Sequence, residues 1–332
     1  MNKGKVVVFG STGTVGAYTS SLLSKKGYEV IAVGRRSDDG GYFDSIGAKY
    51  ISIDITDKAC FERLPKADVV AVLHFAGVMP SKMLGYHPQK YIDSIIKGTM
   101  NVLDYCRESG SEKIVFTQTR ADSHSHMGTD KPLNDDIVKG YPKTGDHSIY
   151  TICKNAAVDI IEHYHEEYGL KRFIFRLPTI YAYHPDFYFY VNGQKKKKAY
   201  WQMIHSALEG KTLEIWGDPS KKKEIFYVKD MAKAALLAVE SRKNGGIYNV
   251  GRGKGVTIEE QVMGIADVFS PSAAGTEVVY RPDMPDGRQF VHSIKKISDE
   301  LGFSPDYDYL GMLQDMKKEM HEKPFKLLWG EG

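Results

Sequence analysis

A tyrosine and a lysine four residues apart are the strongest candidates for proton chemistry in this sequence. Tyr150 and Lys154 stand in the segment YTICK, and a spacing of four places both side chains on one face of a helix. A tyrosine hydroxyl has a pKa of about 10, and a nearby ammonium group favours its ionised form. Such a pair can take a proton from a hydroxyl group while hydride leaves the same carbon. Because the chain has 21 tyrosines, the surroundings of this pair decide its meaning.

Three glycines near the start of the chain indicate a site for a dinucleotide. Gly10, Gly13 and Gly16 follow an apolar stretch in KVVVFGSTGTVG and open a helical pattern. Glycines at these positions permit a tight turn, a close approach of backbone to pyrophosphate, and close packing of helix on strand. The helix N-terminus then faces the anion. The strand–turn–helix context makes this more specific than a glycine triplet alone, which is also found in structural turns.

The end of the second apolar stretch bears on which dinucleotide binds. An NAD site usually has a carboxylate here, about 20 residues after the glycines, for the ribose 2′-hydroxyl. This chain has Arg35 and Arg36 instead, which suit a 2′-phosphate and predict a preference for NADP. Asp38 and Asp39 follow closely and keep NAD open. The competing interpretation is a loop in which both arginines are solvated.

An aspartate after the third apolar stretch is a further cofactor candidate. Asp54 is well placed for the adenine amino group. Alternatively, Asp54 or Thr56 caps the next helix, because Asp and Thr are favoured at that position. The two roles are compatible.

The elements that must position these residues alternate in type through the first half of the chain. Short apolar runs separated by amphipathic stretches predict parallel strands covered by helices on both faces, a doubly wound sheet of the Rossmann type in the α/β class. We expect strands at 5–10, 28–34, 49–54, 68–77, 112–117 and 171–177 and helices at 14–26, 88–109 and 148–168.

The pattern changes after about residue 180, where aromatic and lysine-rich segments lead into short strands and helices. We expect helices at 229–241 and 257–268 and strands in LEIWG, FYV, GIYNVG and EVVY. The predicted domains are therefore residues 1–178 for the dinucleotide and 179–332 mainly for the substrate, with some later elements returning to the first. Ligands of open parallel sheets bind at the carboxyl ends of the strands, which places a cleft between the two regions.

Composition excludes several classes of protein. The 332 residues are 42% hydrophobic with a net charge of +3, which excludes disordered chains and argues against a nucleic-acid binder. Seven basic residues fall in two runs, Lys195 to Lys198 and Lys221 to Lys223, so the remainder is slightly acidic. We interpret the first run as a solvated loop and assign the second, chiefly Lys223, to a phosphate group.

Targeting and metal signals are also lacking in the sequence. Three scattered cysteines suit neither a disulfide framework nor a zinc site, so no metal is expected. The chain shows no signal peptide and no membrane span, and we predict a cytoplasmic protein without membrane partners.

Taken in order, the motifs resemble those of a known family. The chain is similar to extended short-chain dehydrogenases/reductases of the NAD(P)-dependent sugar-nucleotide epimerase/dehydratase family over roughly residues 5–305. The resemblance implies a Rossmann domain, a smaller α/β domain for a sugar nucleotide, and a homodimer built on the helices at 88–109 and 148–168. It rests on VFGSTGTVG, DITD, HFAG, KGT, YTICK, RLPTIYAYHP, IWGD, FYVKD, IYNVG and LGFSP.

The resemblance also implies roles for individual residues. Thr119 falls at the hydroxyl partner of the catalytic tyrosine, where it would hold the reacting oxygen; Thr117 is the second choice. The implied cofactor residues are Gly10, Ser11, Thr12, Gly13, Thr14, Val15, Gly16, Arg35, Arg36, Asp54, Ile55, Phe75, Ala76, Gly77, Tyr150, Lys154 and Pro178. The implied substrate residues are Ser81, Thr119, Thr179, His184, Lys223, Arg281 and Arg288.

Departures from the family pattern narrow the reaction. Arg120 and Ala121 replace the Asp-Glu pair of the 4,6-dehydratases, which disfavours water elimination. His184 falls at a histidine that some members use in catalysis, although such a histidine is more often structural. Lys223 stands where the family has arginine; lysine still binds phosphate, as a point charge.

The resulting hypothesis is a sugar-nucleotide epimerase that oxidises C4 transiently, with Tyr150 as base. The alternative is a keto-sugar-nucleotide reductase that uses NADPH, which Arg35 and Arg36 favour. A non-catalytic sensor of NADP is a more remote alternative, because such proteins commonly lack the Tyr/Lys pair.

Overall fold

A parallel sheet forms the centre of the computed structural model, which describes residues 3–191, 194–271 and 275–331, the side chain of Asp146 excepted. In these residues seven parallel strands lie in the order β13-β6-β5-β4-β1-β2-β3. Their bounds are β1 Lys5–Phe9, β2 Glu29–Gly34, β3 Lys49–Ser52, β4 Val69–His74, β5 Lys113–Thr119, β6 Lys171–Leu177 and β13 Gly245–Asn249. The predicted α/β fold of the Rossmann type is confirmed.

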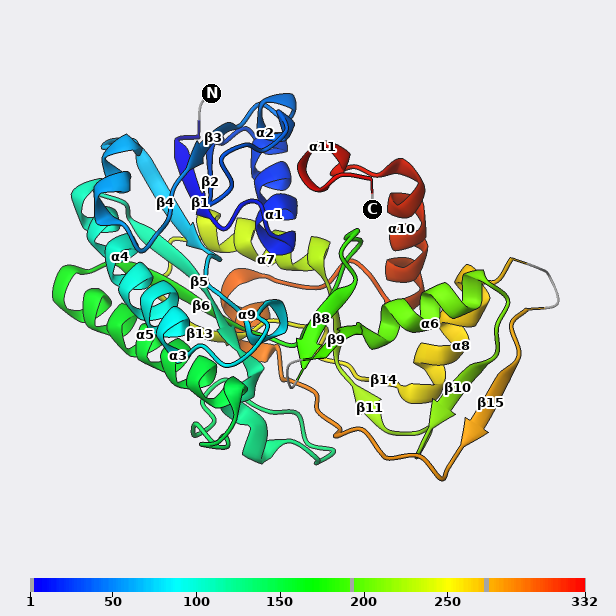
Figure 1. Cartoon of the computed structure of the whole chain (residues 1–332). Helices are drawn as coiled ribbons and strands as arrows, with labels where there is room; N and C mark the ends of the chain where they lie inside the picture. Colours follow the sequence, from blue (N-terminus) through cyan, green and yellow to red (C-terminus); the bar gives the residue numbers. More distant parts are fainter. Residues whose placement is uncertain (1–2, 192–193, 272–274, 332) are drawn as a thin grey trace.

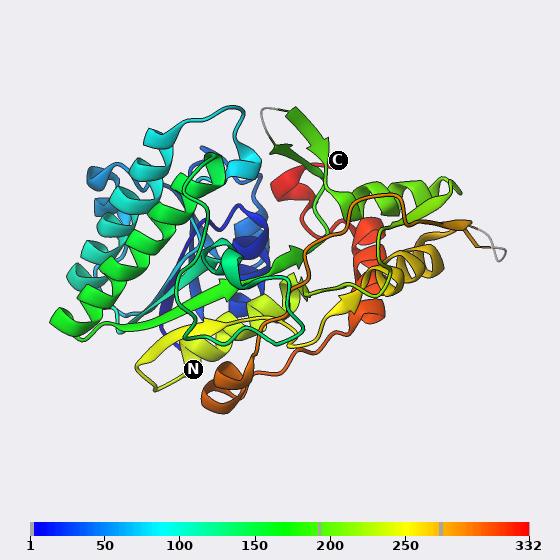
Figure 2. The same cartoon turned by 90° about the horizontal axis from the view of Figure 1, so that it is seen from below.

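Each face of the sheet is buried under helices because the strands are apolar on both faces. In β1, Val6 and Val8 belong to one core cluster and Val7 and Phe9 to the other. The first cluster lies under α1 (Thr14–Lys25) and α7 (Val228–Glu240), and the second under α4 (Gly98–Glu108) and α5 (Asp146–Tyr168). Figures 1 and 2 show the two helical layers on opposite sides of the sheet.

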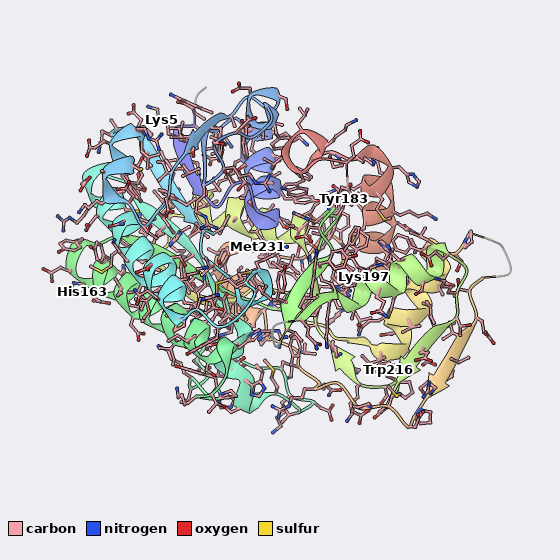
Figure 3. All side chains as sticks on the ribbon, in the orientation of Figure 1. Lys5, His163, Tyr183, Lys197, Trp216 and Met231 are labelled. Atoms are coloured by element: carbon pink, nitrogen blue, oxygen red, sulfur yellow. The ribbon has the colours of Figure 1, made fainter. Side chains whose placement is uncertain are left out.

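The later part of the chain forms a second region beside the carboxyl ends of the strands (Figure 1). It contains α6 (Ala199–Leu208), α8 (Ile258–Phe269), α10 (Tyr309–Glu322) and the parallel pair β10 (Leu213–Trp216) and β15 (Val278–Arg281). Helix α8 begins with a capping box, in which Thr257 and Glu260 satisfy each other's backbone N–H groups. Figure 3 shows Met231 of α7 deep in the molecule, whereas Trp216 lies out in this second region.

Some elements differ from the sequence expectation. The helix expected at 88–109 is divided into α3 (Pro88–Tyr91), a π-helical segment η3 (Ile92–Lys97), and α4. The first lysine run is not simply a loop, because β9 (Gln194–Lys197) pairs antiparallel with β8 (Tyr188–Val191). Helices α6, α10 and α11 had no counterpart in the sequence prediction.

The remaining elements connect these layers. They are α2 Tyr42–Ser45, η1 Lys58–Arg63, η2 Pro80–Lys82, α3 Pro88–Tyr91, η3 Ile92–Lys97, η4 Arg120–His126, β7 Thr179–Tyr181, β11 Lys222–Lys223, β12 Ile225–Tyr227, β14 Val256–Thr257, α9 Lys295–Leu301 and α11 Lys326–Trp329. The domain division at residue 178 stays a prediction; β13 lies in the main sheet. No helix in the described part of the chain is both long and apolar enough to cross a lipid bilayer.

Candidate functional site

The glycine loop has the geometry that a pyrophosphate requires. Gly10 has a φ of 84°, and a Cβ there would lie 2.8 Å from the backbone N of Ala76, so the turn needs glycine. A Cβ on Gly16 would lie 2.2 Å from the carbonyl oxygen of Gly10, so the start of α1 packs directly on the turn. Gly13 is the N-cap of α1, and its Cβ would meet nothing nearer than 3.4 Å. The loop therefore leaves its helix N-terminus accessible to an anion, and the residues fit a dinucleotide.

The two arginines after β2 have different environments. The Arg35 side chain is exposed and forms no hydrogen bond or ion pair with any described residue. Arg36 donates from Nη1 to the carbonyl oxygen of Leu328 at 2.6 Å, and its own carbonyl accepts from the hydroxyl of Tyr50. Arg36 is thus partly engaged by the C-terminus of its own chain, whereas Arg35 is free to meet a ligand.

Residues 325–329, here called the C-terminal segment, pack beside α1 (Figures 1 and 2) and contact the glycine loop. The indole N–H of Trp329 donates to the carbonyl oxygen of Thr12 at 2.9 Å. The Trp329 ring also packs on Phe325 and His184, with centroid distances of 4.5 and 4.3 Å. No sequence motif indicated this contact, because 317 residues separate Trp329 from Thr12.

Asp54 and its neighbours form a turn just after β3, in which the backbone N–H of Asp57 donates to the carbonyl oxygen of Asp54. Asp54 accepts hydrogen bonds from both the backbone N–H and the hydroxyl of Thr56. The helix that follows, η1, is capped by Asp57, so the expectation of a cap at Asp54 or Thr56 was wrong. Ile55 is buried, and a Cβ on Gly98 would lie 2.6 Å from its Cδ1.

Tyr150 and Lys154 lie on α5 at the end of β5, as the spacing predicted. The Lys154 ammonium donates to the carbonyl oxygen of Thr117 at 2.7 Å and lies 4.3 Å from the ring centre of Phe116. Burial lowers the pKa of Lys154 to about 7 and raises that of Tyr150. Nothing in this arrangement favours the phenolate over the phenol, so its formation requires further positive charge near the Tyr150 oxygen.

Thr119 ends β5 and caps the short helix η4. Its Oγ1 accepts a hydrogen bond from the backbone N–H of Ala121 at 3.1 Å. This bond uses one lone pair, and the hydroxyl hydrogen stays available to a ligand. Thr119 and Tyr150 line the same cavity, as does Thr117.

A cavity of about 1130 Å³ joins the two regions of the molecule, and we call it the main cavity. It extends from the start of α1 and the end of β4 to the space between α6, β10 and α8. Among the residues that line it are Thr14, Val15, Phe75, Ser81, Thr119, Tyr150, Pro178, Thr179, His184, Lys198 and Lys223. It therefore brings together predicted cofactor, catalytic and substrate residues.

Two of the predicted substrate residues do not reach the main cavity. Arg281 lies in β15, exposed, and forms ion pairs with Glu214 and Asp283 at 3.1 and 2.8 Å, which raise its pKa. Arg281 is therefore paired within the chain and away from the main cavity, and its contact with a phosphate stays a prediction. Arg288 lies beside His124, with Nη1 3.2 Å from Nε2, outside the main cavity.

Each of the two lysine runs has some residues that line the main cavity and others that do not. Lys221 and Lys222 do not line the main cavity, and Lys221 lies 3.9 Å from Asp218. Lys198, which ends the first run, does line it, and burial lowers its pKa to about 8. The interpretation of that run as a solvated loop therefore missed one cavity residue.

His184 is a neutral member of the cavity wall. Its Nδ1 accepts a hydrogen bond from the backbone N–H of Asp186 at 2.9 Å, and its ring packs on Trp329. Burial and the charges of Lys198 and Lys82 lower its pKa to about 3. The imidazole is thus uncharged at neutral pH and carries its proton on Nε2.

Comparison with known proteins now identifies the family. The model of the NAD dependent epimerase/dehydratase family matches residues 6–251. This chain belongs to that family. The predicted resemblance is confirmed, and with it the assignment as an enzyme of the extended short-chain dehydrogenase type.

Individual members of the epimerase/dehydratase family cover nearly the same length. The UDP-glucuronate 4-epimerase of Thermodesulfobacterium geofontis is 26% identical over 280 residues, which is 80% of each chain. The structure of Thermotoga maritima UDP-glucose 4-epimerase with UDP-glucose matches with a TM-score of 0.75 at 22% identity, over 96% of this chain and 99% of that one. The structure of Bacillus cereus UDP-glucuronic acid 4-epimerase with UDP-glucuronic acid and NAD matches with a TM-score of 0.73 at 20% identity, over the same shares. These structural matches establish the shared fold.

Proposed function

We propose that this enzyme is a 4-epimerase of nucleotide sugars that uses a tightly held NAD(P). The observation that carries the proposal is the main cavity, because one continuous space is lined by Thr14 and Val15 next to the glycine loop, by Thr119 and Tyr150, and by Lys223. A dinucleotide at the loop and a nucleoside diphosphate near Lys223 would then place a sugar between them, at the tyrosine.

Each catalytic side chain has a distinct role in this proposal. Tyr150 takes the proton from the C4 hydroxyl, and Thr119 donates a hydrogen bond to the same oxygen and holds it at the tyrosine. A bound nicotinamide supplies hydride acceptance and return at the sugar carbon. Lys154, anchored on the Thr117 carbonyl, would bring its ammonium group to the same helix face as Tyr150, and the positive charge of a bound oxidised nicotinamide would add to it; together the two charges would favour the phenolate. After the keto-sugar turns, Tyr150 gives the proton back.

The cofactor site takes its shape from backbone and its charge from few residues. Gly10, Gly13 and Gly16 form the cradle, and Asp54 contacts the adenine. Arg35 carries the preference for a 2′-phosphate, since Arg36 is partly engaged by Leu328. The structures of the Thermus thermophilus UDP-glucose 4-epimerase and of the Bacillus cereus enzyme contain NAD, so the preference for NADP is proposed from Arg35 of this chain and not from those relatives.

A keto-sugar-nucleotide reductase using NADPH is the second candidate. The observation that favours it is the exposed Arg35, which has no partner among the described residues at the end of β2. The two functions differ in the fate of the cofactor: an epimerase regenerates it in every cycle, whereas a reductase must exchange it.

The deciding experiment combines one variant with an analysis of retained ligands. Purified wild-type protein is denatured, and released dinucleotide and nucleotide sugar are identified by mass spectrometry. We expect retained NAD(P) together with interconversion of C4 epimers, and loss of turnover by about 100-fold or more in Tyr150→Phe with dinucleotide binding kept. An empty site with NADPH-dependent reduction would favour the reductase. Unchanged turnover in Tyr150→Phe would reject the catalytic assignment.

The proposed assembly is a homodimer in the cytoplasm. Ile92, Met100 and Ile152 lie on the helices expected to pair, and their side chains are 38%, 44% and 39% exposed. Apolar side chains on one helical layer support an interface there. The three cysteines are all free, which suits a reducing compartment.

A further inference from the structure

A second, smaller cavity opens beside the catalytic tyrosine and is not used by the proposal above. Its volume is about 420 Å³, and we call it the side cavity. It shares Met79, Ser81, Thr119 and Tyr150 with the main cavity. Beyond them it is lined by η4 and by the segment that enters α5, including Arg120, His124 and His147. Whatever enters this space therefore lies next to the atoms that react.

The charge of the side cavity has one sign. No Asp or Glu is among the residues that line it, and its cation is Arg120; burial and the neighbouring arginines lower the pKa of His124, which also lines it, and favour the uncharged imidazole. The Arg120 guanidinium lies 4.5 Å from the ring centre of Phe290 and 3.7 Å from the sulfur of Met127. It forms no ion pair with any side chain that the structure describes. Burial lowers the pKa of Arg120, which shows that its charge is poorly solvated.

A neighbouring arginine shows how this fold treats a buried guanidinium whose role is structural. Arg176 donates from Nε to both carboxylate oxygens of Asp122 at 3.0 Å and from Nη1 to the side chain of Asn249. Its charge is balanced within the chain. Arg120, only two residues from Asp122 in the sequence, has no such balance and borders an open space instead.

Two further basic side chains, Lys223 and Arg288, lie in the surroundings of Arg120. Burial, and with it the charge of Arg120, lowers the pKa of both Lys223 and His124. Arg288 lies beside His124 and lowers the pKa of that histidine further. A carboxylate that enters the side cavity would meet a guanidinium with unused N–H donors, in surroundings without a competing acid.

We infer that the side cavity binds a carboxylate carried by the sugar, and that Arg120 selects acidic nucleotide sugars over neutral ones. The inference rests on the proposed function, since the diphosphate near Lys223 and the hydroxyl at Tyr150 fix the sugar between the two cavities. A group at the side cavity must then be a substituent of the reacting ring. The carboxylate is attached either at C6, as in a uronic acid, or through an ether, as in a muramic acid.

The test measures binding in a background that cannot turn over. In Tyr150→Phe with NAD, dissociation constants are measured by calorimetry for two matched pairs: UDP-glucuronate with UDP-glucose, and UDP-N-acetylmuramate with UDP-N-acetylglucosamine. We expect at least one acidic sugar to bind about 10- to 100-fold more tightly than its neutral partner. Adding Arg120→Gln should reduce that ratio to near 1 and leave the affinity for the neutral sugar unchanged. The exposed Lys254→Gln, outside both cavities, serves as the control that keeps the ratio.

The outcomes separate this inference from the proposed function. Equal binding within both pairs, or a preference that survives Arg120→Gln, would overturn the carboxylate site. A preference that depends on Arg120 in a chain whose wild type epimerises none of the four sugars would support the site and reject the epimerase. Matching melting temperatures of the single and double variants show that the fold is kept.

Discussion

The glycine loop (residues 10–16) and the wall of the main cavity are built in opposite ways. The loop is made of backbone: Gly10 and Gly16 approach neighbouring main-chain atoms so closely that a Cβ at either would lie within 3 Å of them. The wall is made of side chains from segments far apart in sequence, from Ser81 to Lys223. A site made of backbone can be recognised from one short sequence motif. A site made of side chains cannot, because each side chain can instead pair with another residue of the chain.

The consequence is visible in the predicted residues. Of the seven predicted substrate residues, Arg281 and Arg288 are the two that do not line the main cavity. Arg281 forms ion pairs with Asp283 and Glu214 instead. Each test below therefore compares two variants, in the glycine loop, in basic residues or in adjacent arginines, for which we expect different effects on ligand affinity or stability.

The largest effect is expected in the backbone site. Gly13→Ala adds a Cβ that meets nothing nearer than 3.4 Å in the protein, but it fills the space that a pyrophosphate requires. We expect dinucleotide affinity to fall by about 100-fold or more, with the melting temperature of the ligand-free protein unchanged. Calorimetric titration with NAD and NADP and a thermal melt measure the two properties.

A second glycine variant makes this test sharper. Gly16→Ala places a Cβ 2.2 Å from the carbonyl oxygen of Gly10, so it should lower the melting temperature as well as the affinity. Normal dinucleotide binding by Gly13→Ala would show that the loop does not hold the cofactor.

The next test compares a basic residue that lines the main cavity with one that does not. Lys223→Gln removes a partly buried ammonium from the main cavity, and we expect the affinity for UDP to fall about 10- to 100-fold. Arg281→Gln removes an exposed cation that is already paired, and we expect the affinity to stay within about twofold. Calorimetric titration with UDP measures both. An equal loss in the two variants would mean that the wall extends to β15.

These contrasts explain what the sequence could predict. Alternation of apolar runs was enough for the sheet, because buried parallel strands are apolar on both faces. The positions of Gly10, Tyr150 and Lys154 followed from local spacing. By contrast, Lys198 lines the main cavity directly after β9, which pairs with β8. Trp329 contacts Thr12 although 317 residues separate them. No local pattern reports such contacts. Glu214, one of the two acidic partners of Arg281, likewise comes near it only when β10 and β15 pair, whereas Asp283 is two residues away in the sequence.

A smaller effect is expected at the end of β2, where two adjacent arginines differ. Arg35→Gln should lower the affinity for NADP about 10-fold and leave that for NAD unchanged, because only NADP has a 2′-phosphate. Arg36→Gln should instead lower the unfolding free energy, since it loses the hydrogen bond to Leu328. Fluorescence titration and urea unfolding measure these. Equal losses for both dinucleotides in Arg35→Gln would contradict the predicted preference.

The pH dependence of stability tests the buried lysine of the proposed catalytic pair. Burial lowers the pKa of Lys154 to about 7, below its unfolded value, so between pH 7 and about 10 the unfolded chain binds the additional proton. Stability should therefore rise with pH through this window, by at most about 1.4 kcal/mol per pH unit for one proton. Lys154→Met should flatten the curve, while Lys198, still present in both proteins, keeps its own contribution. If the plots of unfolding free energy against pH had the same slope in the wild type and in Lys154→Met, the pKa of Lys154 would not be lowered by folding.

The smallest effect concerns the C-terminal segment, where a side chain from the far end of the chain reinforces the backbone site. Trp329→Phe keeps an aromatic ring against His184 and Phe325 but loses the N–H that bonds the Thr12 carbonyl. We expect the unfolding free energy to fall by about 1 kcal/mol, measured by urea unfolding. Leu327→Ala, at an exposed position of the same segment, should change it by less than about 0.5 kcal/mol. If Trp329→Phe were as stable as the wild type, the hydrogen bond from Trp329 would contribute nothing to the stability of the glycine loop. The loop would then depend only on its own backbone, unlike the wall of the main cavity, which depends on side chains from distant segments.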